Sequence, residues 1–282
     1  MTTASVDTRA FSPFEWLLAG RYLRARRTEG FISVIAGFSF LGILLGVATL
    51  IVVMAVMNGF RKELFDKIIG LNGHVIVNKI GGPFEDYDAV AKRIATVAGV
   101  RHALPLIEGQ AMVSTPAQAT GALVRGLTEE GVKSLALVAG SVQQGTFDNF
   151  DQSGGVAIGT RLADKLRIAR IGDQITVIQP RGAATPFGTS PRIKTYPVVA
   201  IFELGMSEYD RTVLFMPFEE SQRFFNRGAS ADVVEVLVDD ADQVAQRTVV
   251  LRGLGDTSLH FSDWRQRNQT FINVLDLERT MM

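Results

Sequence analysis

The sequence predicts an α+β protein in which one membrane-spanning helix precedes a water-soluble body. Residues 31–57 contain no charge, and 21 of these 27 residues are hydrophobic. The rest of the 282-residue chain has the composition of an ordinary soluble domain. In that remainder, short β-rich runs and helical patterns follow each other without a strict βαβ rhythm, which favours a mixed α+β architecture over a parallel sheet.

The apolar segment is long enough to cross a bilayer. A helix of this length reaches about 40 Å, and the hydrocarbon core is about 30 Å thick. It is too long for the apolar core of a signal peptide, which has about 7–15 residues. Four arginines lie just before it: Arg21, Arg24, Arg26 and Arg27. Because positive flanks stay in the cytoplasm, we expect a cytoplasmic N-terminus and a body on the other side of the membrane.

Two helical features accompany the span. Pro13 to Arg27 has an apolar face and predicts a helix in the cytoplasmic membrane interface, with simple continuation of the spanning helix as the alternative. Within the span, the small residues Ser39, Gly42 and Gly46 share one helix face. Small residues let helices approach closely in lipid, so this face is expected to pack against partner helices.

The soluble body has recognisable elements and one candidate boundary, the Gly-rich and polar stretch 140–155. A helix is also expected from a Ser262 cap through Met282. Strands are predicted at 74–77, 106–114, 122–125, 156–158, 175–178, 198–202, 213–216 and 233–238, and helices at 87–97, 161–167, 218–225 and 241–251.

Residues 179–197 stand apart because they contain four of the nine prolines. Proline is excluded from central strands, so this stretch must leave the sheet as a long hairpin or loop. Long excursions of this kind are usually functional or disordered. Phe187 lies at its middle, between Pro186 and Gly188, and has no obvious core to enter.

Several classes of function are disfavoured. The 29 positive and 29 negative residues give no basic stripe for nucleic acid, and no cysteine is present for disulfides or thiol chemistry. There is no phosphate-binding loop and no G-x-S-x-G motif, and the three histidines are scattered. We therefore expect no catalytic residue, no metal site and no enzyme activity in this chain.

Two blocks of sequence resemble a known family. The first block contains Phe14-Glu15-Trp16, Arg21-Tyr22-Leu23-Arg24, Gly30-Phe31-Ile32-Ser33 and Val56-Met57-Asn58-Gly59-Phe60. It is similar to the N-terminus of the LolC/LolE family, the permease subunits of the lipoprotein-releasing ABC transporter. The second block, 155–176, is similar to the periplasmic domain of that family and, more loosely, to MacB-type permeases.

The resemblance implies a MacB-like periplasmic domain, with a porter-like α+β part and a β-rich part that carries a protruding hairpin. It implies a subunit of the bacterial inner membrane that extracts lipoproteins and hands them to a periplasmic carrier. The implied partners are a cytoplasmic ATPase that binds ATP and Mg²⁺, a second permease subunit (identical or distinct), the carrier and the lipoprotein cargo. This chain itself would hold no cofactor. The hairpin, or hook, would contact the carrier through Thr185, Pro186, Phe187, Gly188, Pro191 and Arg192.

Family members continue into further spans, so we expect a fragment or truncated product whose second spanning helix begins near residue 269. The predicted domains are a cytoplasmic N-terminus (1–30), the span (31–57), the periplasmic domain (58–268) with its hook (179–197), and the start of that second helix (269–282). The alternatives are a MacB- or FtsX-like mechanotransmission permease for another substrate, and a single-pass anchored binding or scaffold protein.

Overall fold

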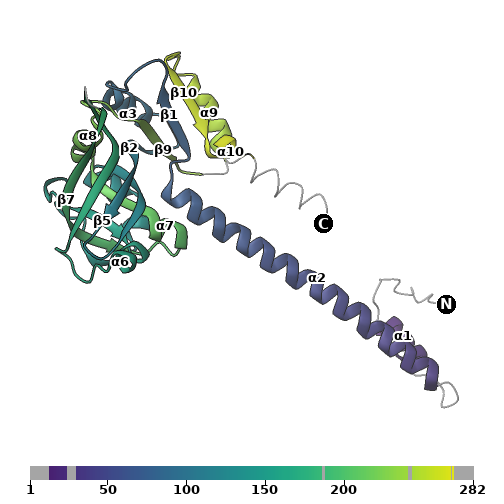
Figure 1. The fold of residues 1–282 in the computed structure, drawn as a ribbon. Helices are drawn as coiled ribbons and strands as arrows, with labels where there is room; N and C mark the ends of the chain where they lie inside the picture. The colour runs from purple at the N-terminus through teal and green to yellow at the C-terminus, as the bar shows by residue number, and fades with distance from the viewer. Residues whose placement is uncertain (1–12, 24–29, 186–187, 241–242, 268, 270–282) are drawn as a thin grey trace. The chain divides into compact units, whose positions relative to one another are not determined.

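The computed structural model describes residues 13–23, 30–185, 188–240, 243–267 and 269. The chain divides into two compact units, Met1–Leu64 and Phe65–Met282, and each is described by itself. Figure 1 gives the labels of the helices and strands.

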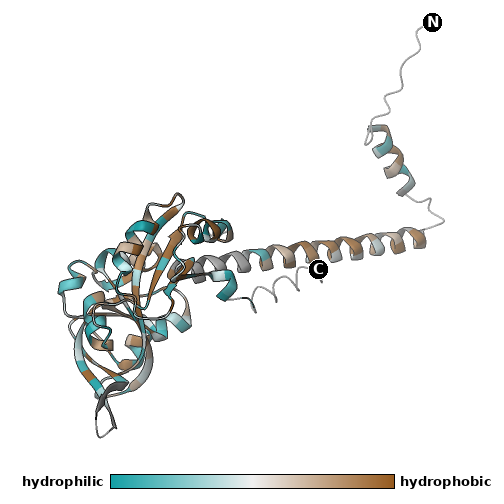
Figure 2. Cartoon of the chain, turned by 90° about the horizontal axis from the view of Figure 1, so that it is seen from above, coloured by the Kyte–Doolittle hydropathy of each residue, from teal (hydrophilic) through white to brown (hydrophobic). Residues whose placement is uncertain are grey.

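The first unit holds α1 (Pro13–Leu23) and most of α2 (Gly30–Leu71). Within α2, the segment Val34–Gly59 has a mean hydropathy of 2.8, and none of its side chains is buried in this chain. Figure 2 shows the apolar character of α2. The segment is long and apolar enough to cross a membrane, as predicted for residues 31–57.

Six strands of the second unit close into a barrel. The neighbours follow the order β2-β3-β8-β5-β7, and β6 closes the ring because it pairs with both β2 and β7. The pairs β3–β8 and β5–β7 are parallel, and the other pairs in the ring are antiparallel. The strands are β2 (Val100–Ser114), β3 (Ala119–Leu127), β5 (Val156–Gly159), β6 (Gln174–Thr185), β7 (Gly188–Phe202) and β8 (Val213–Pro217), and the short β4 (Val142–Gly145) pairs with β7.

Barrel strands that contain no polar side chain are buried on both faces, as β5 shows. Val156 and Ile158 of β5 belong to one core cluster with α6 (Thr160–Leu166) and α8 (Phe218–Phe225). Ala157 of the same strand belongs to a second cluster. Burial on both faces explains why these strands are continuous apolar runs. The second cluster is completed by the short helices α4 (Glu129–Ser134) and α5 (Ala136–Ala139) and by Phe147 and Phe150.

A second, antiparallel sheet extends from the barrel through the same long strand. The first part of β2 pairs with β9 (Val233–Val238), which pairs with β1 (Val75–Lys79), and β1 pairs with β10 (Leu259–Asp263). Helices α3 (Tyr87–Ala95) and α9 (Val244–Arg252) share one core with this sheet. The strand β2 therefore belongs to both sheets: Val100–Leu106 pair with β9 in the second sheet, and Ile107–Ser114 pair with β3 in the barrel.

A buried ion pair lies where these parts meet. The Nη2 atom of Arg125 (β3) is 2.6 Å from Oε2 of Glu235 (β9), and the two side chains are 1% and 2% exposed. The Nη1 atom of Arg125 donates to the carbonyl oxygen of Leu71, the last residue of α2, at 2.7 Å. Gly73 makes this approach possible, because a Cβ there would lie 2.7 Å from Cβ of Glu235.

The chain enters β1 and leaves β10 at the same end of the second sheet. Val75 of β1 pairs with Asp263 of β10, and the backbone N–H of Trp264 donates to the carbonyl of His74. The N–H of Val238 donates to Nδ1 of His74 at 3.0 Å, so the imidazole is an acceptor here. Burial holds the pKa of His74 below its usual value, which favours the neutral ring that can accept this bond.

Two sequence expectations are wrong. The stretch from Ser262 does not start as a helix, because Leu259 and Phe261 alternate into the core and Ser262 lies in β10. The helix α10 (Trp264–Arg267) starts after Asp263, whose Oδ1 accepts from the N–H of Gln266 as a cap. The expected continuation through 270–282 lies outside the described residues.

The stretch 140–155 is not a domain boundary either, since it lies inside the second unit. Its phenylalanines, Phe147 and Phe150, are buried and pack edge to face at 5.5 Å. The other predicted strands and helices are confirmed to within a few residues at most ends, and α8 matches its predicted bounds. The strands β2, β6 and β7 are longer than predicted.

We predict that Arg125→Met destabilises the second unit by about 3–5 kcal/mol, because Glu235 would keep a buried charge without its partner. Adding Glu235→Leu should recover much of this loss, since an apolar pair removes the unpaired charge. Urea unfolding of the detergent-solubilised chain, followed by Trp264 fluorescence in a Trp16→Phe background, measures both effects. If Arg125→Met alone is as stable as the unchanged chain, the assignment of a buried ion pair between Arg125 and Glu235 is contradicted.

Candidate functional site

The proline-rich excursion is a long β-hairpin formed by β6 and β7. Regular pairing runs from Gln174↔Pro197 to Gln179↔Arg192, then shifts, and resumes from Ala183↔Ser190 to Thr185↔Gly188. The prediction of a hairpin is therefore confirmed for the described residues. Pro180 lies in the shifted region, where a ladder tolerates a residue without an N–H.

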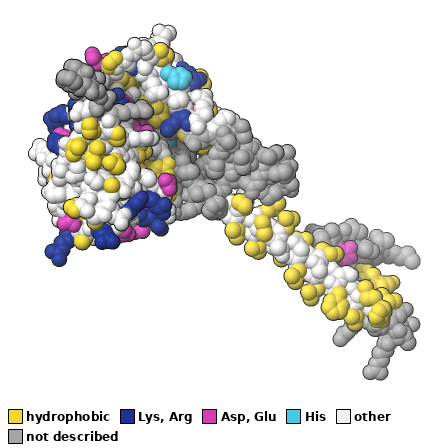
Figure 3. All heavy atoms as spheres, in the orientation of Figure 1, with side chains coloured by type: hydrophobic (Ala, Val, Ile, Leu, Met, Phe, Trp, Pro, Cys, Tyr) yellow, Lys and Arg dark blue, Asp and Glu magenta, His cyan; other side chains and the backbone are white. Residues whose placement is uncertain are grey.

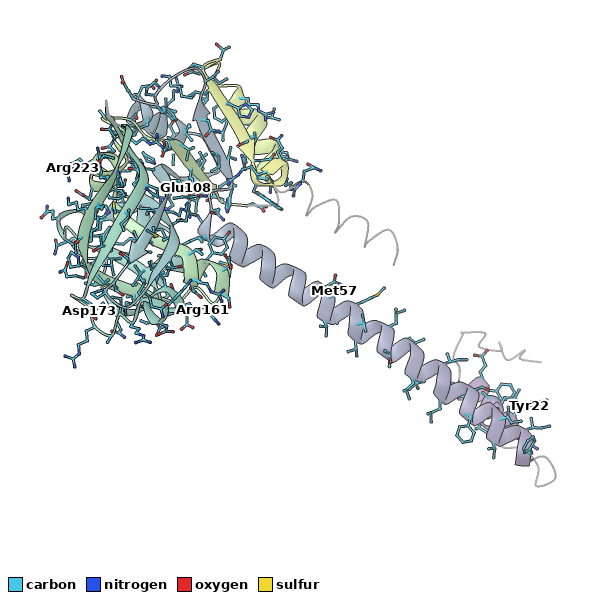
Figure 4. The ribbon with its side chains drawn as sticks, viewed as in Figure 1. Tyr22, Met57, Glu108, Arg161, Asp173 and Arg223 are labelled. Carbon is cyan, nitrogen blue, oxygen red and sulfur yellow. The ribbon has the colours of Figure 1, made fainter. Side chains whose placement is uncertain are left out.

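The root of the hairpin is part of the barrel. Residues Thr176–Ile178 of β6 pair with β2, and beyond Ile178 the structure pairs β6 with β7. The turn that leads into β6 is fixed by Asp173, whose Oδ2 accepts from the N–H groups of Ala169 and Arg170 (Figure 4). The hairpin therefore starts from a rigid base and leaves the sheet as the prolines predicted.

The predicted carrier-binding residues are only partly described. Pro186 and Phe187 lie outside the described residues, and Thr185 and Gly188 are described by their backbone pairing alone, so the role of these four residues stays a prediction. Pro191 is exposed on β7. Arg192 lies on β7 as well, is partly exposed, and donates hydrogen bonds to carbonyl oxygens of this chain.

Arg192 ties the hairpin to the end of α8. Its Nη1 donates to the carbonyl oxygens of Arg223 and Phe224, the latter at 2.9 Å. These carbonyls belong to the last turn of α8, which ends at Asn226 in the left-handed conformation. The end of a helix carries unsatisfied carbonyls and partial negative charge, so a guanidinium is favourable there.

A second contact follows two residues along β7. Oε1 of Glu220, on α8, accepts from Nζ of Lys194 at 2.6 Å and from the hydroxyl of Tyr196 at 2.7 Å. Its Oε2 accepts from Nε of Arg223 at 3.2 Å. Figure 4 marks Arg223 on this helix. We call Arg192, Lys194, Tyr196, Glu220 and Arg223 the hairpin anchor.

Glu220 is the one carboxylate of the hairpin anchor, and it accepts hydrogen bonds from Lys194, Tyr196 and Arg223. Burial of the Glu220 carboxyl opposes ionisation, but the hydrogen bonds from Lys194 and Tyr196 outweigh it, so the pKa of Glu220 lies below its usual value. Burial and the hydrogen bond to Glu220 raise the pKa of Tyr196. Tyr196 therefore stays a neutral donor, and Glu220 stays an anion, over the neutral range.

Two glycines seat α8 on the barrel. A Cβ at Gly126 would lie 1.9 Å from Oγ of Ser221, and a Cβ at Gly109 would lie 2.3 Å from the ring of Phe225. Strands β2 and β3 can therefore approach α8 only because these positions lack side chains. The anchor thus connects the hairpin to a helix that is itself fixed to the barrel.

Apolar side chains lie on the outer face of the barrel beside the hairpin root. Met112 pairs with Ile178, and Ile178 pairs with Ile193, so the three form one row across β2, β6 and β7. Met112 is 39% exposed and Ile193 is 60% exposed. Figure 3 shows apolar side chains gathered on a face of the second unit. Exposed apolar surface of this kind marks interaction sites.

The sequence did not reveal the row or the anchor. Glu220 has the pattern of a solvated helix charge, and the alternation in β6 and β7 does not show which strands are neighbours. The signal available in the sequence was Ile193, an apolar residue between Arg192 and Lys194. Within the described part of the chain, no group of three or more metal-ligating side chains is found.

In the predicted packing face of α2, Ser39, Gly42 and Gly46 are exposed. A Cβ at Gly42 or Gly46 would meet nothing within 4 Å in this chain. Figure 4 shows side chains of α2, such as Met57, projecting away from the helix. This face is therefore open for a partner, although no partner is shown.

The fold and the hairpin define a class of protein. The sequence model of the MacB-like periplasmic core domain matches residues 36–248, and the chain belongs to that family.

Within this family, the chain is similar to particular proteins. The chain is 32% identical to the lipoprotein-releasing system transmembrane protein LolC of Xylella fastidiosa (strain Temecula1) over 96% of this chain and 65% of that protein. It is 27% identical to LolC of Neisseria meningitidis serogroup B over 93% of this chain and 63% of that protein. The predicted resemblance is thus confirmed, and the chain spans slightly less than two thirds of these relatives. The periplasmic region of MacB from Actinobacillus actinomycetemcomitans is also similar, at 17% identity and a TM-score of 0.46, over 75% of this chain and 98% of that one.

We predict that Glu220→Gln weakens the hairpin anchor and destabilises the second unit by about 1.5–3 kcal/mol, because bonds to a charged acceptor become bonds to a neutral amide. The folded-state pKa of Glu220 is lowered, so its contribution is complete above the usual carboxyl pKa and is lost as the pH falls through the lowered value.

The difference in free energy of unfolding between the unchanged chain and Glu220→Gln, measured in urea, should therefore be largest near pH 7 and shrink toward pH 3. Glu219→Gln is the matched control, because Glu219 is the exposed neighbour on the same helix. An equal effect of both variants, or a difference that does not depend on pH, would rule out the anchor.

Proposed function

We propose that this chain acts in an inner-membrane permease subunit of an ABC transporter that extracts lipoproteins and passes them to a periplasmic carrier. The observation that carries the proposal is the anchored hairpin of residues 174–202 on a MacB-like domain, together with similarity to LolC proteins over almost the whole chain. The chain is not itself an enzyme in this proposal. A separate cytoplasmic ATPase supplies ATP hydrolysis with Mg²⁺.

The membrane segment fits the proposed arrangement. Helix α2 crosses the inner membrane with the arginine-rich N-terminal flank in the cytoplasm, and the second unit lies in the periplasm. The open face at Ser39, Gly42 and Gly46 packs against helices of the complex, which contains a second permease subunit.

The hairpin works as a rigid arm. Binding costs less when the binding segment is ordered beforehand, and the anchor orders the hairpin before a partner arrives. Pro186 precedes Phe187 and restricts the backbone there, so this side chain enters an apolar groove of the carrier at a lower ordering cost. Arg192 and Lys194 have partners on α8 and position the hairpin, and Arg192 also stays among the residues proposed to contact the carrier.

We predict that Phe187→Ala weakens binding of the purified carrier at least about tenfold, because buried aromatic anchors of interfaces commonly contribute 2 kcal/mol or more. Biolayer interferometry on the full chain in nanodiscs measures the dissociation constant. Ser190→Ala, on the same strand as the tip, is the control and should have no effect. Unchanged binding after Phe187→Ala would remove the hook role.

We also predict that Gly46→Leu blocks assembly with the second permease subunit and the ATPase. A leucine there has room within this chain, so a loss must come from a clash with a partner helix. Ala48→Leu makes a similar change on the opposite face and should leave assembly intact. Co-purification from membranes measures both, and normal assembly of Gly46→Leu would exclude this packing face.

A further inference from the structure

A cleft of about 560 Å³ opens on the barrel beside the root of the hairpin. This volume lies within the range of small-molecule sites, about 300–1,000 Å³. The cleft is lined by Gln110, Ala111, Met112, Gly121, Ala122, Leu123, Pro180 and Thr212. These residues come from β2, β3, the hairpin and the end of α7 (Ser207–Thr212).

The lining selects against charged ligands. None of the described residues that line the cleft is charged, and the polar groups are the amide of Gln110 and the hydroxyl of Thr212. Met112 adds a flexible side chain that adapts to irregular apolar shapes. A phosphate or an acidic peptide would lose its hydration here without gaining a counter-charge.

The backbone of the cleft selects against an added strand. Ala111 pairs with Ala122 and Met112 with Gly121. On their other sides, Met112 pairs with Ile178 and Leu123 with Val213. Both strands are therefore interior, and an extended peptide would find no free edge to pair with. A hydrocarbon needs no hydrogen bonds and loses nothing at such a surface.

Gly121 keeps the floor of the cleft open, since a Cβ there would meet nothing within 4 Å. The cleft is also continuous with the apolar row, because Met112 belongs to both. The row continues through Ile178 to Ile193 on β7. An apolar path therefore runs from the cleft to the hairpin.

We propose that this cleft binds one saturated hydrocarbon chain, and that its occupant is an acyl chain of the lipid-modified cargo on its way to the hairpin. The second part rests on the proposed function, whereas the first part rests on the lining, the paired backbone and the open floor. The cleft is then a holding site between the membrane and the carrier.

The test uses the full chain in nanodiscs and a palmitic acid analogue that carries a diazirine and an alkyne. After irradiation, trypsin cleavage at Arg101 and Arg125 releases the peptide of residues 102–125, which contains both cleft strands. We expect the label on this peptide. Gly121→Leu fills the cleft and should lower the labelling about tenfold, equivalent to about 1.4 kcal/mol of binding free energy.

Gly82→Leu is the matched control, because a Cβ at Gly82 also meets nothing within 4 Å and lies outside the cleft. It should leave the labelling unchanged. Met112→Gln provides a second cleft variant at a partly exposed position, and it should lower the labelling if Gly121→Leu does not fold. Thermal unfolding reports the folding of each variant.

Labelling of residues 102–125 that folded cleft variants leave unchanged, or no labelling there, would overturn the inference. These outcomes are separate from the proposed function. Carrier binding that depends on Phe187 together with an unlabelled cleft would overturn the cleft alone. A labelled cleft without carrier binding would overturn the proposed function and the cargo as the occupant, and would leave the hydrocarbon site standing.

Discussion

The guanidinium of Arg125 is the point at which the barrel, the second sheet and the end of α2 meet. It bonds Glu235 of β9 and the carbonyl of Leu71 from its own position on β3. A buried ion pair of this kind adds little net stability over an apolar pair, but it is costly to break or to misalign. We therefore infer that its role is to fix position: it holds Leu71 beside β3 and β9. The absence of a side chain at Gly73 lets the backbone there approach Glu235.

The position of the hairpin depends on how the barrel and the second sheet are joined, and α8 provides the connection. Because β2 runs through both the second sheet and the barrel, the position of β2 decides where the hairpin root lies. The glycines at 109 and 126 bring α8 onto β2 and β3, and the hairpin anchor then connects α8 to β7. An arm that binds a partner by one aromatic side chain needs such support, since a loosely held arm would pay the ordering cost on binding.

The two faces of the hairpin root have different chemistry. On one face, Glu220 of α8 accepts hydrogen bonds from Lys194 and Tyr196 of β7 and from Arg223 of its own helix. On the outer barrel face, Met112, Ile178 and Ile193 form an apolar row that leads to a cleft whose described lining residues are uncharged. Because residues in a strand alternate between faces, one short stretch of β7 can serve both purposes.

The sequence by itself determined the elements whose signals are local. The uncharged run of α2, the amphipathic α8 and the prolines of the hairpin each lie within one continuous stretch of at most 27 residues, so their patterns could be read directly. Contacts between distant segments could not be read in this way. Arg125 and Glu235 are 110 residues apart, and Ser262 lies in a strand only because β1 pairs with β10. The hairpin anchor, the apolar row and the cleft are therefore formed by strand pairing and by the packing of α8 on the barrel. These features depend on which segments are neighbours, and the tertiary fold alone determines that.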